Sequence, residues 1–184
     1  MKSIEEMTQA ELGAFVQTHL RKQGIDVVLS GGAAVAIFSS GKYVSKDLDM
    51  VRTYAAGRRA IYAAMSAIAF GEEQGKYFRH PKSEHLVEFL PGPPTIGEEP
   101  VGRIDEIQYA TGTLRIISPT DCVKDRLAAY YHWQDRQSLA QAVMVAEENE
   151  VDLQEIERWS GGEGKLDKFE DFRAQLTNTS EKHG

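Results

Sequence analysis

The chain has 184 residues, of which 41% are hydrophobic and 27% are charged, and its formal net charge is −7. This length fits one domain, or a core with a helical appendage, and the composition allows a buried core. The acidic balance disfavours long nucleic acids as ligands, because they bind through many contacts between basic side chains and phosphates. A local basic patch is still compatible with it, drawn from Arg52, Arg58, Arg59, Lys124 and Arg126.

Three features bear on the cellular setting of the chain. Residues 1–9 are polar and mixed in charge, which is not the pattern of a secretory signal. The longest apolar stretch, residues 60–70, is too short to span a bilayer. The single cysteine, Cys122, excludes an intrachain disulfide framework and a multi-cysteine zinc site. We therefore expect a cytoplasmic protein without a membrane partner.

The first part of the chain alternates between helix and strand patterns. Residues 4–22 carry apolar side chains at helical spacing, and Gly24 stands where a left-handed cap is expected. The apolar run 27–29 predicts a buried strand that leads through two glycines into a helix over 33–38. The segments predicted next are a strand over 46–51, a helix over 57–70, strands over 76–78 and 85–90, a proline loop over 91–94, and a hairpin over 104–109 and 113–117.

From residue 118 the pattern becomes helical. Ser118, Pro119 and Asp121 form a strong helix start, with a capping hydroxyl, a proline in the first turn and an acid three residues after the cap. Helices are predicted over 119–133, 135–149, 152–159 and 166–176. We expect an α/β fold with a short, mixed, twisted sheet flanked by helices. Its core would cover residues 1–117, and a helical segment, 118–184, would pack on that core.

The first candidate site is the turn at Ser30, Gly31 and Gly32. A strand that turns through glycines into a helix leaves free N–H groups and the positive helix end directed at one spot. Such a spot binds phosphate. The alternative is a tight turn that needs glycine only for its backbone geometry.

The second candidate is the pair Asp47 and Asp49. Alternation along a strand puts both carboxylates on one face and Leu48 on the other. Two close carboxylates suit a divalent cation such as Mg²⁺ or Mn²⁺, which can also hold substrate phosphates. The alternative is the polar face of a half-exposed strand, with each acid paired to a surface base.

The third candidate is Glu88, a lone acid within the apolar strand 85–90. An unpaired carboxylate would be costly there, so a metal, a base or solvent at the strand end is implied. The alternative is a Glu88 side chain that faces water while Val87 and Phe89 face the core.

The order of these features is informative. An apolar strand, Gly31-Gly32, a helix, a strand with Asp47 and Asp49, and a later strand with Glu88 follow one another. In this order the sequence resembles the nucleotidyltransferase superfamily of the DNA polymerase β type, especially its small stand-alone bacterial members. The resemblance covers about residues 27–90.

The resemblance implies roles for the matching residues. Asp47 and Asp49 would hold Mg²⁺ against a nucleoside triphosphate, whose phosphates would contact Gly31, Gly32 and Ser30. Glu88 would complete a second metal position and help to activate the attacking hydroxyl. Lys124 is the expected phosphate-facing cation, although a solvated helix position is the alternative for it.

The implied reaction moves a nucleoside monophosphate to an acceptor hydroxyl, on an RNA end, a protein side chain or a small molecule such as an aminoglycoside. A different class of function also fits the sequence: a nucleotide-binding module without turnover that acts as a regulator or as one half of a toxin–antitoxin pair, with a protein partner. A third interpretation is an ordinary α/β interaction domain, in which arginines such as Arg52 would cap Asp47 or Asp49.

Overall fold

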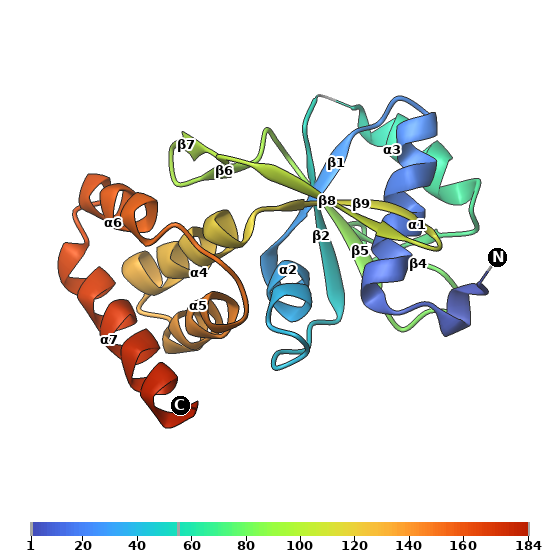
Figure 1. The fold of residues 1–184 in the computed structure, drawn as a ribbon. Helices are drawn as coiled ribbons and strands as arrows, with labels where there is room; N and C mark the ends of the chain where they lie inside the picture. The colour runs from blue at the N-terminus through green and yellow to red at the C-terminus, as the bar shows by residue number, and fades with distance from the viewer. Residues whose placement is uncertain (1, 55, 184) are drawn as a thin grey trace.

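The computed structural model describes residues 2–54 and 56–183. Its centre is a seven-stranded mixed sheet of order β3-β4-β5-β2-β1-β9-β8 (Figure 1). A separate two-stranded ribbon, β6-β7, follows β5 in the chain. The strands are β1 Val27–Ser30, β2 Asp47–Arg52, β3 Gly71–Glu73, β4 Tyr77–Arg79, β5 Leu86–Leu90, β6 Thr95–Ile96, β7 Glu99–Pro100, β8 Ile104–Tyr109 and β9 Gly112–Ile117. The expected mixed sheet with flanking helices is therefore confirmed.

Helices cover the sheet on its two sides. In Figure 1, α1 and α3 lie on one side, whereas α4 to α7 gather on the other and α2 lies between them and the strands. The helices are η1 Ile4–Glu6, α1 Gln9–Lys22, α2 Gly31–Phe38, α3 Arg58–Ser66, α4 Pro119–Trp133, α5 Arg136–Glu148, α6 Leu153–Gly162 and α7 Leu166–His183. None of these helices, within the described residues, is long and apolar enough to cross a membrane.

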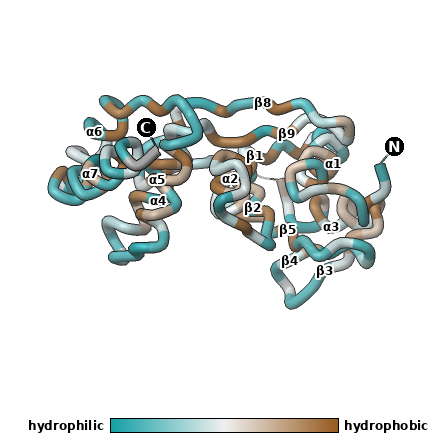
Figure 2. The backbone as a smooth tube through the Cα atoms, turned by 60° about the horizontal axis from the view of Figure 1, so that its bottom comes forward, coloured by the Kyte–Doolittle hydropathy of each residue, from teal (hydrophilic) through white to brown (hydrophobic). Residues whose placement is uncertain are grey.

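The central strands supply the core of the sheet. Val28 and Leu29 of β1 are fully buried, as are Leu114 and Ile116 of the parallel neighbour β9. Figure 2 shows the corresponding brown, hydrophobic stretches along β1 and β9, in contrast to the mostly teal surface helix α7. Burial of such side chains contributes about 25 cal/mol per Å² of apolar surface, so this region anchors the fold.

Strand β2 separates an apolar face from an acidic one. Leu48 and Met50 are fully buried, close to the Gly13 position of α1. Because side chains alternate along a strand, Asp47 and Asp49 lie on the opposite face, which is the face of α2. The expected sharing of one face by the two acids therefore follows from the register of β2.

The N-terminal helix is shorter than predicted. Residues 4–22 do not form one helix, because η1 ends at Glu6 and α1 begins only at Gln9. Thr8 caps α1 by accepting a hydrogen bond from the Glu11 N–H (3.3 Å), and the Glu11 carboxylate accepts one from the Thr8 N–H (2.7 Å). This capping box explains why α1 begins at Gln9. Gly24 has the expected left-handed conformation after the helix, with φ of +73°.

Other boundaries also differ from prediction. Helix α3 ends at Ser66 and not at Phe70, and β3 begins at Gly71 after a turn over residues 67–70. The β6-β7 ribbon was not predicted, because two-residue strands carry no periodicity. Helix α6 continues through the glycines at 161 and 162, and α7 runs on to 183. The Ser118 cap and the helix 119–133 are confirmed. The division of the chain at residue 117 stays a prediction.

Candidate active site

The turn from β1 into α2 brings Gly31 against Asp49. Gly31 has φ of +65°, and a Cβ placed on it would lie 2.2 Å from Oδ2 of Asp49. Both the conformation and the space therefore require glycine. Ser30 is the cap residue of α2, but its side chain makes no capping hydrogen bond. Ser30 also pairs with Asp49 across the antiparallel β1-β2 ladder. The N-terminus of α2 and the acidic face of strand β2 thus meet at Gly31 and Asp49.

A second close approach involves Gly32 and a residue that the sequence did not single out. A Cβ on Gly32 would lie 3.1 Å from the Ser45 hydroxyl oxygen, which in turn donates to the Asp47 carbonyl (3.2 Å). Ser45 therefore adds a hydroxyl beside the helix entry. The sequence offered one indication of this role: Ser45 stands two residues before Asp47 and therefore lies close to the first acid.

Asp49 is the most perturbed acid at the site. Its pKa is raised to about 6, mainly by burial and in addition by the neighbouring charges of Glu88 and Asp47. Glu88 stands directly opposite Asp49 in the parallel β2-β5 register. Since both strands expose these residues on the same face, the three carboxylates share one surface. Perturbed acids of this kind concentrate at functional sites.

Glu88 already has a cationic partner. The Lys76 ammonium lies 2.8 Å from the Glu88 carboxylate and 4.9 Å from the centre of the Tyr77 ring. Hydrogen bonding to Glu88 raises the pKa of Lys76. Among the residues that the structure describes, no three His, Cys, Asp or Glu side chains are arranged to hold a metal ion. In this geometry Glu88 is an ion-paired carboxylate and does not complete a three-acid cluster.

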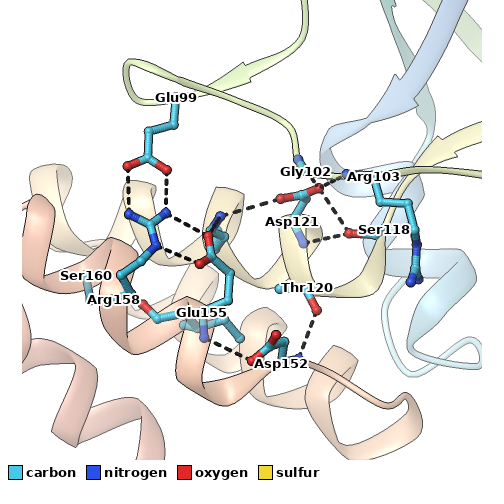
Figure 3. Close-up of polar contacts among 12 residues, drawn as sticks. Glu99, Gly102, Arg103, Ser118, Thr120, Asp121, Asp152, Glu155, Arg158 and Ser160 are labelled. Carbon is cyan, nitrogen blue, oxygen red and sulfur yellow. Dashed lines mark hydrogen bonds and ion pairs between the residues drawn. The ribbon is translucent and has the colours of Figure 1, made fainter.

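Lys124 lies in a different environment from the one expected. Its side chain is almost fully buried, and its ammonium donates to Glu155 of α6 (2.9 Å) and lies 3.7 Å from Asp121. Glu155 in turn binds Arg158, which forms two hydrogen bonds with Glu99 of the β6-β7 ribbon (Figure 3). The contacts of Lys124 thus join α4 to α6, and this geometry does not support a phosphate contact.

Arg126 of α4 acts electrostatically on Asp49. Its positive charge opposes the rise in the pKa of Asp49. The guanidinium donates to Asp125 through Nε (3.1 Å) and through Nη2, and to Gln141 of α5 through Nη1 (3.4 Å). Lys124 and Arg126 are two residues apart and project from different sides of the helix, but the sequence does not indicate which side faces the acids.

The five basic residues considered together do not form one patch. Arg52 and Arg58 line a cavity with Lys76, whereas Lys124 is held by Glu155 and Arg126 by Asp125. Capping of the acids by Arg52 is not observed either. Arg52 donates to the Ala56 carbonyl (2.7 Å), and it is not among the charges that shift the pKa of Asp49.

Comparison with known proteins places this architecture. No protein-family model matches the chain, and no curated protein sequence matches it. Among solved structures, a nucleotidyltransferase-like antigenic protein from Paracoccidioides brasiliensis matches with a TM-score of 0.53 and 14% identity, over 74% of this chain and 75% of that one. ANT(2'')-Ia in complex with adenylyl-2''-tobramycin matches with a TM-score of 0.50 and 17% identity, over 95% of this chain and 99% of that one.

A solution structure of the antibiotic-resistance factor ANT(2'')-Ia also matches, with a TM-score of 0.50 and 15% identity, over 92% of this chain and 93% of that one. The chain therefore has the nucleotidyltransferase fold, as its motifs had indicated. At these identities the likeness defines the fold, and activity has to be argued from the site.

Proposed function

We propose that the protein is a nucleotidyltransferase that moves a nucleoside monophosphate from a nucleoside triphosphate to an acceptor hydroxyl. The observation that carries the proposal is the contact between the Gly31 turn and the Asp49 carboxylate, where a Cβ would lie 2.2 Å from Oδ2. The N-terminus of α2 and a half-buried acid with a raised pKa meet there, on a fold shared with ANT(2'')-Ia. Each feature alone has a structural explanation, but their contact favours a ligand that is both anionic and accompanied by a cation.

The phosphates of the triphosphate would lie at the start of α2. There the N–H groups of Gly31 and Gly32 and the hydroxyl of Ser30 are available as donors, and the helix dipole favours negative charge. Ser45, beside Gly32, would add a further hydroxyl. The residues of α2 are otherwise apolar, so charge neutralisation must come from elsewhere.

Asp47 and Asp49 fit a divalent cation that arrives with the triphosphate. Mg²⁺ is usually held by one or two carboxylates together with substrate phosphates, so a cluster of three protein acids is not required. Mg²⁺ or Mn²⁺ bound there would withdraw charge from the phosphate oxygens and stabilise the leaving pyrophosphate. The raised pKa of Asp49, caused by burial and by the neighbouring acids, is the electrostatic reason why a cation would bind.

Arg126 takes the place that the sequence suggested for Lys124. Its charge reaches Asp49 across the space between α4 and the sheet, whereas the ammonium of Lys124 is engaged by Glu155. A guanidinium also suits phosphate, because its fork of donors can bind two oxygens at once. We therefore assign the contact with phosphate to Arg126.

Glu88 is the proposed general base. The acceptor oxygen would form a bond to the α-phosphorus as the bond to pyrophosphate breaks, and the hydroxyl proton would pass to the Glu88 carboxylate. A general base must lie within hydrogen-bond reach of that proton. Glu88 sits beside Asp49 on the same face, which supports this role, but it must first be released from Lys76. The second-metal role expected for Glu88 is not needed in this scheme.

The proposal is tested by ligand-induced stabilisation. The melting temperature of the pure protein would be measured with each of the four ribonucleoside triphosphates, with and without Mg²⁺ or Mn²⁺. A ligand at 100 times its Kd stabilises the native state by about 2.7 kcal/mol, which is easily detected. We expect a shift with at least one triphosphate that depends on the metal.

The test variant carries both Asp47→Asn and Asp49→Asn. Its control is Asp105→Asn, which removes a carboxylate from the edge strand β8. The metal-dependent shift should disappear in the double variant and persist in Asp105→Asn. If no triphosphate produced a shift, or if the double variant retained it in full, the proposed site would be wrong.

The ion pair between Lys76 and Glu88 favours a second candidate function. In that case the protein binds a nucleotide without turnover and acts as a regulator, or as one half of a toxin–antitoxin pair with a protein partner. Binding without release of pyrophosphate, over a panel of RNA ends, proteins and small hydroxyl compounds that includes an aminoglycoside, would support it. Pyrophosphate release with any acceptor would exclude it.

A further inference from the structure

A cavity of about 340 Å³ opens beside Glu88, between α3, the end of β5 and the β3-β4 turn. Its apolar wall is formed by Ile61, Phe78 and Phe89, the last two with rings at 5.6 Å in an edge-to-face arrangement. This size is within the range of small-molecule sites, and an apolar wall with a few polar groups is their usual composition. Since Glu88 also lines the cavity, a molecule bound here would touch the proposed general base.

Three basic side chains lie at this cavity: Arg52, Arg58 and Lys76. Two acids, Glu72 and Glu88, accompany them, so the cavity has an excess of positive charge although the whole chain carries −7. The ion pair between Arg58 and Glu72 (2.8 Å) involves an arginine side chain that is 74% exposed. Exposed ion pairs of this kind contribute little, so an incoming anion can displace them.

Two independent features indicate that the cavity accepts an anion. The guanidinium of Arg52 donates through Nη1 to the Ala56 carbonyl, but its buried Nε atom has no hydrogen-bond partner among the described residues. Helix α3 begins at the cavity with Arg58, its cap Gly57 has no side chain to offer, and no acid stands in its first turn. Basic residues at a helix N-terminus are unfavourable by themselves, and a bound anion would reverse that penalty.

We propose that this cavity is the acceptor site and that the acceptor is a small molecule with an anionic group, a phosphate or a carboxylate, next to an apolar portion. That the bound molecule is an acceptor rests on the proposed function. A polycation such as tobramycin, named for the ANT(2'')-Ia complex, would meet Arg52, Arg58 and Lys76 and be repelled.

The cavity also explains how Glu88 becomes a free base. An anionic group bound by Lys76 competes with Glu88 for the ammonium, which lies 2.8 Å from the carboxylate when no acceptor is bound. Glu88 is then released beside the hydroxyl whose proton it takes. The correct acceptor would in this way activate its own base, and an uncharged hydroxyl compound would leave Glu88 paired.

The test uses phenyl phosphate as the probe, with the full-length ¹⁵N-labelled chain and no nucleotide. We expect saturable amide shifts at Arg58, Gly75 and Lys76. Arg58→Gln with Lys76→Gln should weaken binding by about tenfold or more, the loss of one or two charge-assisted hydrogen bonds. Arg173→Gln, which removes another exposed arginine at an ion pair on α7, is the matched control and should bind as the wild type. Benzoate replaces phenyl phosphate in a second arm that separates carboxylate from phosphate recognition.

Benzyl alcohol and benzylamine are the neutral and cationic counterparts. Equal binding of either would overturn the proposal, as would phenyl phosphate shifts confined to residues 31–33. Phenyl phosphate is measured without triphosphate or metal, so its binding is scored separately from that of the nucleotide. A failure of phenyl phosphate to bind therefore removes the anionic acceptor and leaves nucleotide binding standing, whereas a failure of nucleotide binding leaves this cavity intact. Well-dispersed spectra of each variant establish that it is folded.

Discussion

Two charged clusters adjoin α4, and they differ in how their charges are balanced. Around Lys124 each cation meets an acid: the ammonium binds Glu155, and Arg158 binds Glu155 and Glu99 (Figure 3). Around Asp49 three carboxylates share one face, burial and the neighbouring acids raise the pKa of Asp49, and Arg126 only partly offsets them. The first cluster holds elements together. The second carries an excess of like charge that a ligand with a cation would relieve.

The largest effect is expected for Lys124→Met. The substitution leaves Asp121 buried beside an apolar side chain and removes one partner of Glu155. Removing one partner of a buried ion pair typically costs about 3–5 kcal/mol, and we expect about 3 because Asp121 still accepts three hydrogen bonds. Urea unfolding measures the loss. Arg173→Gln is the exposed control, and a loss below 1 kcal/mol would contradict the structural role of Lys124.

Gly31→Ala should have the next largest effect, and it falls on the other cluster. A residue with a side chain is strained at φ of +65°, and its Cβ would collide with Oδ2 of Asp49. We expect a loss of about 1–3 kcal/mol, the cost of strained backbone, together with loss of triphosphate binding. Gly24→Ala is a useful comparison, because it shares the left-handed conformation but meets no atom within 4 Å. It should lower stability without affecting nucleotide binding.

Asp49→Asn should increase stability at pH 8. The pKa of Asp49 is raised from 3.8 to about 6, so the folded state binds the proton more tightly than the unfolded chain does. The charged carboxylate therefore destabilises the fold above about pH 6, and this penalty disappears as the pH falls towards 4. A rise of the pKa from 3.8 to about 6 corresponds to at most about 3 kcal/mol, and we expect about 1–2 kcal/mol because the carboxyl is partly solvated.

Unfolding at a series of pH values measures this gain. The gain in stability should be present at pH 8 and vanish near pH 4. At that pH the Asp49 carboxyl of the wild type is protonated, so it is uncharged like the amide of the variant. A gain of the same size at both pH values would mean that it does not come from the charge of Asp49.

The smallest effect is expected for Glu99→Gln. The carboxylate pairs with Arg158, whose side chain is 54% exposed, and surface pairs of this kind contribute about 0–1 kcal/mol. Arg158 keeps its contact with Glu155 in this variant. Thermal unfolding should show a change below 1 kcal/mol that becomes smaller in high salt. A larger loss would mean that the β6-β7 ribbon depends on this pair for its position.

The sequence predicted those parts of the site that depend on local patterns. Alternation placed Asp47 and Asp49 on one face, and the glycine pair marked the strand-to-helix turn, because both follow from periodicity and backbone preference. The contact of Gly31 with Asp49 could not be predicted, since it depends on how β1 and β2 are registered.

The interactions that the sequence did not predict share one cause: they join residues far apart in the chain, and local patterns do not reveal such pairs. Lys124 was expected to face phosphate, but the packing of α6 against α4 gives its ammonium to Glu155. Lys76 was not considered at all, although the β3-β4 turn brings it to Glu88. Arg126 stood among five basic residues, and only the tertiary arrangement directs its charge at Asp49.

The most direct measurement compares Asp49→Asn and Lys124→Met in one experiment, by their melting temperatures at pH 8 with and without Mg²⁺ and the triphosphate that stabilises the wild type. We predict that Asp49→Asn melts higher than the wild type and shows no ligand-induced shift. Lys124→Met should melt lower and keep the full shift. The reverse pattern, with the shift lost in Lys124→Met and kept in Asp49→Asn, would contradict the assignment of the active site to the acidic face of the sheet.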